Sequence, residues 1–110
     1  MIRLVAALAL CPLAAHAELS MNTVRYTCER GVEVPVTYVS DGADGVAVLT
    51  VEGRQISLFS ESADAGARYG WPSDGSNYVW LTKGADATLN WKDGTSGTEA
   101  ALLTGCMEQQ

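Results

Sequence analysis

Two cations beside glycines are the residues of this chain best placed to do chemistry. Arg68 lies two residues after Gly66, and Lys83 directly precedes Gly84. The full chain holds 7 Lys or Arg residues against 13 Asp or Glu, for a net charge of −6. Both could be ordinary surface cations. Their placement at turns of an otherwise acidic chain favours contact with an anionic group on a partner, because a charge-assisted hydrogen bond is among the stronger polar contacts.

The other reactive side chains argue against catalysis and against a metal centre. His16 is the only histidine, and Cys28 and Cys106 are expected to pair. Without a histidine or a free thiol, a histidine-based triad or a zinc site lacks its usual groups. Asp41 and Asp44 lie in a glycine-rich turn, but the twelve-position calcium loop that ends in Glu is absent. We therefore predict no enzymatic activity, no cofactor and no metal.

Residues 1–17 have the pattern of a signal peptide that is removed on export. A short positive head is followed by an uncharged apolar run over residues 4–15 and by the small-x-small sequence Ala15-His16-Ala17. The run is too short to span a membrane. A buried first helix is the less favoured interpretation. The mature domain is thus expected over residues 18–110.

Cys11 raises a second possibility, a lipoprotein signal that ends at this cysteine. Large Leu10 stands where such a signal has a small residue, and Pro12 follows the cysteine. We therefore disfavour lipid anchoring at Cys11.

Cleavage before Glu18 would leave an even pair of cysteines in an exported chain, which favours a Cys28–Cys106 disulfide. This bridge would close a loop of 78 residues, for which the chain-entropy stabilisation is roughly 4 kcal/mol. The mature chain would carry a net charge near −7. Such a surface repels nucleic acid and anionic lipid and favours a basic partner.

The mature segment has the pattern of about eight short β-strands separated by glycine or proline turns. We expect them over residues 23–28, 34–40, 46–51, 55–60, 67–69, 78–82, 87–91 and 98–103. Even spacing with turn residues is typical of an antiparallel sandwich or a closed up-and-down barrel. A disulfide between the first and last strands favours the barrel. Residues 18–22 and 107–110 are expected to be loose.

Four aromatic residues suggest a different function, a small barrel that binds a glycan or an apolar ligand. Alternation places Tyr78 and Trp80 on one face of a strand, where packing in the core is the simpler interpretation. Trp71, which precedes Pro72 in a turn, is expected to be more exposed. Trp91 is the fourth of these aromatic residues.

The chain resembles the periplasmic and membrane-bound inhibitors of C-type lysozyme of Gram-negative bacteria. The resemblance rests on Tyr26-Thr27-Cys28, on Ala65-Gly66-Ala67-Arg68-Tyr69, on the segment from Tyr78-Val79-Trp80 through Lys83-Gly84 to Leu89, and on Leu103-Thr104-Gly105-Cys106. It implies an eight-stranded antiparallel barrel with one disulfide, located in the periplasm. It also implies a monomer or weak homodimer with C-type lysozyme as its partner.

In this family a lysine and a serine on two loops enter the lysozyme cleft and reach the two catalytic carboxylates. The lysine corresponds to Lys83, whereas Ala65 stands at the serine position. Ser62 could replace that serine only if the loop is reshaped. The resemblance thus implies a lysozyme-binding set, which comprises Ala65, Gly66, Arg68, Tyr69, Thr82, Lys83 and Gly84.

Overall fold

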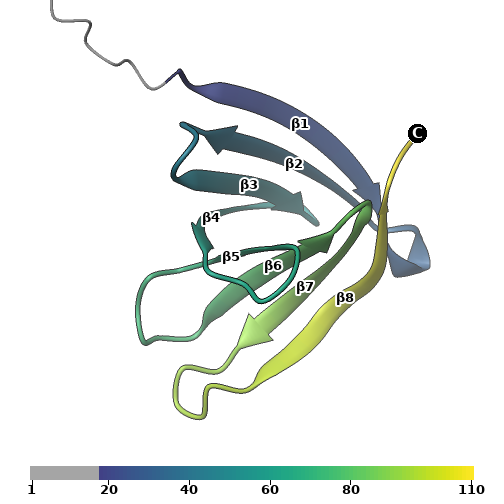
Figure 1. Cartoon of the computed structure of the whole chain (residues 1–110). Coiled ribbons are helices and arrows are strands. Elements are labelled where there is room, and N and C mark those ends of the chain that lie inside the picture. The colour runs from purple at the N-terminus through teal and green to yellow at the C-terminus, as the bar shows by residue number, and fades with distance from the viewer. Residues whose placement is uncertain (1–17) are drawn as a thin grey trace, which may run out of the picture.

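The computed structural model describes residues 18–110; the expected signal peptide and Cys11 lie outside the described residues. The described chain forms eight strands and one short 3-10 helix, shown in Figure 1. The elements are β1 (Ser20–Thr27), η1 (Glu29–Gly31), β2 (Glu33–Ser40), β3 (Gly45–Val51), β4 (Arg54–Glu61), β5 (Ala67–Gly70), β6 (Asn77–Lys83), β7 (Asp86–Lys92) and β8 (Glu99–Glu108). Within residues 18–110, no helix is long and apolar enough to cross a membrane.

Each strand pairs antiparallel with the next, and β8 pairs with β1 to close the barrel. The closing contact is short, with Tyr26 opposite Glu108 and Thr27 opposite Met107. The expected disulfide joins Cys28, directly after β1, to Cys106 in β8. The predicted all-β barrel of eight antiparallel strands with a Cys28–Cys106 bridge is therefore confirmed.

The barrel interior is filled by side chains that alternate with outward-facing ones along each strand. Trp80 is completely buried and makes an edge-to-face contact with Tyr26, their ring centroids 5.1 Å apart. Its indole nitrogen donates to the Tyr38 hydroxyl at 2.9 Å, and the Tyr26 and Tyr38 hydroxyls lie 2.7 Å apart. Burial raises the pKa of Tyr38, so the phenol stays protonated and keeps this buried network paired.

Both ends of the domain are more ordered than the sequence led us to expect. Ser20–Asn22 were expected to be loose but begin β1, because their backbone pairs with Tyr38–Ser40 of β2 whatever their side chains. Met107 and Glu108 likewise belong to β8. The backbone N–H of Gln109 donates to the Arg25 carbonyl at 2.8 Å, and the side-chain amide of Gln109 donates to Thr27 and Glu33. The expectation of loose ends was wrong for these residues.

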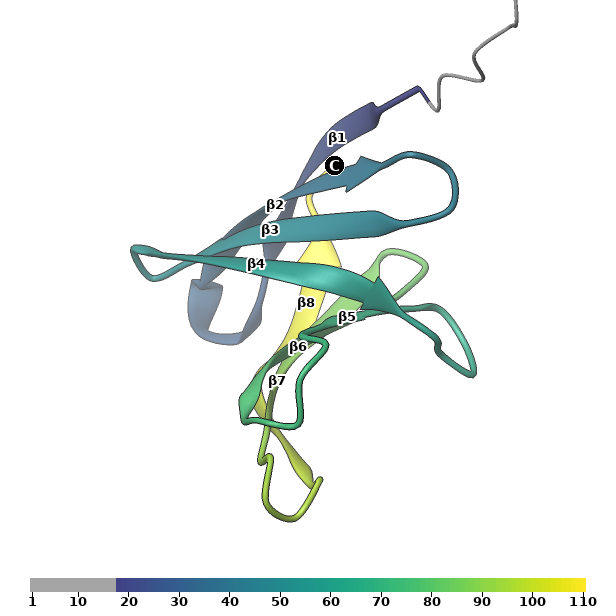
Figure 2. The same ribbon diagram turned by 90° about the vertical axis from the view of Figure 1, so that its left-hand side faces the viewer.

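Alternating strand directions sort the connections onto the two ends of the barrel. The β2–β3, β4–β5 and β6–β7 connections lie together at one end, on the right of Figure 2. The η1 segment and the β3–β4 turn lie at the opposite end. Both glycine turns named in the sequence analysis, at Gly66 and Gly84, therefore belong to the same end.

Candidate functional site

The β4–β5 loop contacts the end of β6, directly before the β6–β7 turn, through Gly66. This glycine has φ +67°, a left-handed conformation that side chains rarely adopt. A β-carbon here would collide with the carbonyl oxygen of Thr82 and would lie 3.3 Å from the Cα of Lys83. The two loops can pack this closely only because residue 66 has no side chain.

Lys83 is the last residue of β6 and is exposed to solvent. It lies opposite Asp86 across the tight β6–β7 turn, which Gly84 closes with φ +61°. Among residues 18–110, no carboxylate oxygen lies within 4.0 Å of its ammonium nitrogen. Lys83 therefore presents an unneutralised cation at the end of the barrel, with its backbone held by the hairpin.

Arg68 differs from Lys83 because two carboxylates surround it. Its Nε donates to Glu61 at 3.1 Å, and its Nη2 donates to Glu99 at 2.6 Å. A third bond, from Nη1 to the other Glu99 oxygen at 3.3 Å, makes the Glu99 contact bidentate. Hydrogen bonding by Arg68 lowers the pKa of Glu99, and Asn90 adds a further donor at 3.2 Å. This network joins β4, β5, β7 and β8, so Arg68 serves to hold the β4–β5 loop in place.

A shallow depression of about 250 Å³ lies on the surface beside the contact between the two loops. Ala65 lies on one side of it, and Thr82, Lys83 and Asp86 lie on the other. Ala65 is exposed and also borders a neighbouring depression with Ser62. The depressions place residue 65 and Lys83 on the rim of a common surface, so a partner that covers one would meet the other.

The remaining residues of the predicted set have different environments. Thr82 is half-buried, and its carbonyl oxygen is the group that approaches Gly66. Tyr69 is also half-buried, but its ring points toward the barrel core and packs against Tyr38, with centroids 5.5 Å apart. Six of the seven predicted residues therefore belong to the loops or their outer surface, whereas Tyr69 lies beneath them and supports β5.

The aromatic residues do not form a single binding face. Trp80 is buried and Tyr78 packs against the core, as alternation predicts. Trp71 is exposed as expected but packs against Phe59, with ring centroids 5.3 Å apart. Trp91 packs edge-to-face on Tyr78 at 5.0 Å. The exposed tryptophans thus lie in separate aromatic pairs.

Neither of the carboxylates that hold Arg68 was predicted from the sequence. Glu61 could have been found from hairpin register, because it lies directly opposite Arg68 in the β4–β5 pair. Glu99 is 31 residues away and reaches Arg68 across the outer face of β6 and β7, and no local pattern indicates that contact.

A family model described as MliC, "Membrane-bound lysozyme-inhibitor of c-type lysozyme", matches residues 26–97. A curated relative from Pseudomonas aeruginosa, "Membrane-bound lysozyme inhibitor of C-type lysozyme", is 36% identical over 85 residues. That match covers 74% of this chain and 64% of the relative, so the chain spans less than two thirds of the relative's length.

Two solved structures share the fold. Pseudomonas aeruginosa MliC, in a crystal structure of its complex with hen egg white lysozyme, superposes with a TM-score of 0.62 at 28% identity. That match covers 99% of this chain and 100% of the other. The Adhesin Complex Protein of Neisseria meningitidis has a TM-score of 0.50 at 17% identity, over 80% of this chain and 99% of the other, and indicates the fold alone. On the strength of the family model and the P. aeruginosa relative, this chain belongs to the family of membrane-bound lysozyme inhibitors of C-type lysozyme.

Proposed function

We propose that this protein inhibits C-type lysozyme by inserting the β4–β5 loop and the β6–β7 turn into the active-site cleft of the enzyme. The observation that carries the proposal is Lys83, which is exposed at the end of β6 beside the β6–β7 turn and has no carboxylate partner among residues 18–110. The P. aeruginosa MliC structure, solved in complex with hen egg white lysozyme, supports this choice of partner.

Lys83 would place its ammonium group between the two catalytic carboxylates of lysozyme. An ammonium there gains charge-assisted hydrogen bonds in a site from which the complex excludes water. Because Lys83 has no ion pair within residues 18–110 that must break first, its charge is available to the enzyme. Truncating one member of a buried intermolecular charge pair costs about 2–5 kcal/mol, which sets the expected importance of this residue.

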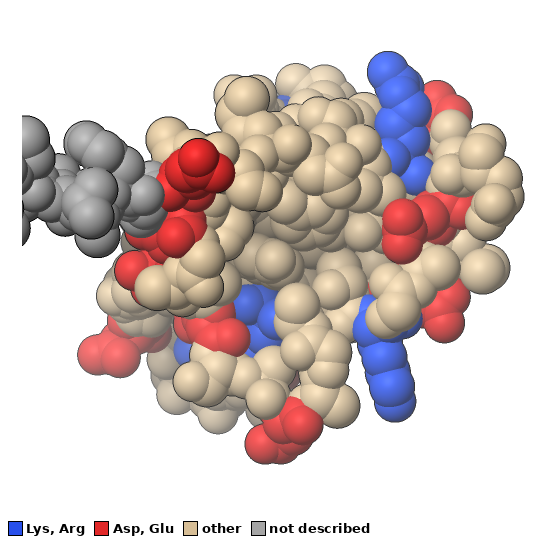
Figure 3. Space-filling model, turned by 45° about the horizontal axis from the view of Figure 1, so that its top comes forward, with Lys and Arg blue, Asp and Glu red and all other residues tan. Residues whose placement is uncertain are grey.

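The acidic surface would guide the approach of the two proteins. Figure 3 shows several separate groups of acidic atoms on one face of the molecule, with Lys and Arg groups among them. Residues 18–110 carry thirteen Asp or Glu residues against six Lys or Arg. A domain with this charge attracts a basic protein such as a lysozyme, and the attraction raises the association rate at low ionic strength. The association rate should therefore fall as salt is added.

In this proposal the protein is a binding protein without catalytic activity. It acts in the periplasm as a mature chain that starts at Glu18, after signal-peptide cleavage and without lipid at Cys11. Mass spectrometry of the protein isolated from its native envelope tests this part. A lipid-modified Cys11 at the mature N-terminus would place the protein on a membrane instead.

The test of inhibition measures the rate at which a C-type lysozyme clears a cell-wall suspension, with and without the purified domain. We expect clearance to slow in a saturable manner. The amount of domain needed for half inhibition should rise with ionic strength. If clearance is unaffected at micromolar concentrations of domain, the proposed function is wrong.

A further inference from the structure

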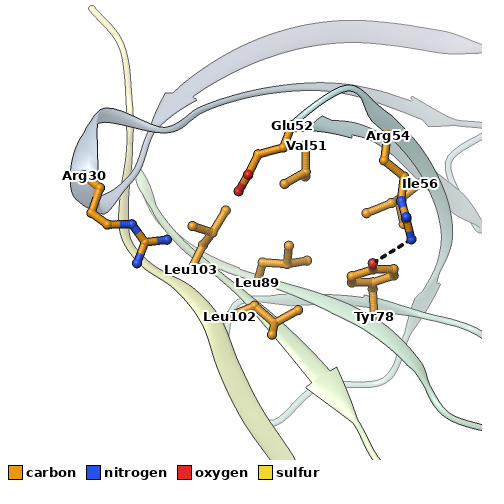
Figure 4. Close-up of a pocket in the computed structure, with 9 residues that line it drawn as sticks. All are labelled: Arg30, Val51, Glu52, Arg54, Ile56, Tyr78, Leu89, Leu102 and Leu103. Carbon is orange, nitrogen blue, oxygen red and sulfur yellow. Dashed lines mark hydrogen bonds between the residues drawn. The ribbon is translucent and has the colours of Figure 1, made fainter.

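Another depression lies at the end of the barrel opposite Lys83, and the lysozyme proposal makes no use of it. It has a volume of about 350 Å³ and lies between η1, the β3–β4 turn and strands β6 to β8 (Figure 4). This volume is at the lower end of the range found for small-molecule sites. The pocket therefore suits a small ligand.

The pocket has an apolar floor. Ile56, Leu89 and Leu103 line it from below, and each is buried in the barrel core. Leu102, by contrast, lies at the side of the pocket and is 43% exposed, so part of its apolar surface is in contact with water. A ligand tail placed here would cover apolar surface that the fold itself leaves open.

The rim of the pocket carries hydrogen-bond donors. Figure 4 shows the Arg54 guanidinium directed at the Tyr78 hydroxyl, to which Nη1 donates at 3.4 Å. Among residues 18–110, no carboxylate lies within 4.0 Å of Arg54. Arg30 lies on the facing side of the pocket. Within residues 18–110, the one carboxylate within 4.0 Å of Arg30 is that of the partly exposed Glu29, at 3.6 Å. Two of the six Lys or Arg residues of this acidic segment thus border one small pocket.

The backbone also holds Arg30 at the rim. Its φ of +61° is left-handed, a conformation that is costly for a residue with a side chain. Glu52, with φ +47°, is the other non-glycine residue of this kind within residues 18–110, and it also lines the pocket. A two-residue hairpin turn accounts for Glu52, since such turns use positive φ. Its carboxylate opposes the cations, so it should weaken the binding of an anion.

We propose that this pocket binds a short alkyl carboxylate. The carboxylate accepts hydrogen bonds from Arg54, and the positive charge of Arg30 on the facing side favours an anion in the pocket. The alkyl tail packs on the floor and against Leu102. The pocket and the Lys83 loops lie at opposite ends of the barrel, so both sites can be occupied together. This inference does not depend on inhibition of lysozyme.

The test uses sodium octanoate as the probe and the methyl NMR signals of Leu89, Leu102 and Leu103 as the readout. We expect saturable shifts with a dissociation constant between millimolar and high micromolar, in keeping with the affinity a ligand of this size can reach. Acetate should not saturate these signals. Lengthening the tail from hexanoate to octanoate should tighten binding, by at most about fourfold per methylene. Octyl glucoside has the same tail without the charge and should bind more weakly.

Variants separate the anion site from general charge effects. Arg54→Gln should weaken octanoate binding at least threefold, whereas Glu52→Gln should tighten it. Arg25→Gln is the matched control, because it removes the same charge from an exposed arginine outside this pocket. An unchanged thermal midpoint shows that each variant is folded. Absence of saturation, equal binding of octyl glucoside, or equal losses in the Arg54 and Arg25 variants would each overturn the proposal.

Discussion

Gly66 packs against the backbone of Thr82 so closely that no side chain fits between them. This contact joins the β4–β5 loop to the end of β6, one residue from Lys83. Because Gly66 also needs φ +67°, its position is restricted both by conformation and by space. The spacing of the two loops, and with it the shape presented to a partner, depends on this glycine.

We therefore predict that Gly66→Ala both destabilises the domain and weakens lysozyme inhibition. The left-handed conformation costs alanine about 1–2 kcal/mol, and the collision with Thr82 adds about 1–3 kcal/mol. Gly53→Ala is the control, since Gly53 has φ +80° but no atom of residues 18–110 beyond its immediate neighbours lies within 4 Å of the added carbon. Urea unfolding and inhibition assays on both variants separate the two contributions. If both variants lose equal stability and both inhibit normally, the Gly66 contact does not position the loops.

Lys83→Ala should raise the inhibition constant for lysozyme at least tenfold without lowering stability. The substitution removes an exposed charge that has no ion-pair partner among residues 18–110, so only the complex is affected. Lys92→Ala removes the same charge from the far end of β7, opposite Glu99 rather than at the turn. The inhibition constant of the Lys92→Ala variant should differ little from that of the wild type. Equal effects of the two substitutions would mean that Lys83 acts only through net charge.

Glu99 should make stability depend on pH. Because Arg68 lowers the folded-state pKa of Glu99 below its unfolded value, the ion pair contributes fully above the unfolded pKa. That contribution is lost as the pH falls through the folded pKa, so the window lies below about pH 4.3. Glu99→Gln should lower the free energy of unfolding by about 1 kcal/mol at pH 7 and by less in acid.

Thermal unfolding from pH 7 to pH 3 measures this difference, which corresponds to about 4–8 °C at neutral pH. Glu52→Gln is the control, because Glu52 has no ion-pair partner within residues 18–110. A gap between wild type and Glu99→Gln that stays constant over the whole pH range would show that the carboxylate charge is not responsible.

The regular part of the fold could be predicted because its causes are local. Strand alternation predicts Tyr78 and Trp80 on the inner face of β6, and glycines mark the turns. Ser20–Asn22 could not be placed in this way, since their pairing with β2 involves only backbone groups. For these three residues, side-chain character carries no information about the strand.

The candidate site could be predicted only in part, for a similar reason. Lys83 is recognisable because a lysine at a glycine turn is exposed by local geometry alone. The pairing of Arg68 with Glu99 could not be inferred, because Glu99 comes from a strand that reaches Arg68 only in the folded barrel. Equally, Tyr69 belongs to the same short motif as Arg68, yet strand alternation directs it inward to Tyr38.

Ala65 offers a direct way to test how much the second loop contributes. It is exposed on the rim that it shares with Lys83, so a hydroxyl added there can face a bound enzyme. Ala65→Ser should tighten inhibition by the value of one hydrogen bond, about 0.5–1.5 kcal/mol or roughly twofold to twelvefold. Ala63→Ser, on the same loop but bordering only the neighbouring depression with Ser62, should leave the inhibition constant unchanged. If Ala65→Ser inhibits no better than wild type, residue 65 does not occupy the position of the family's serine.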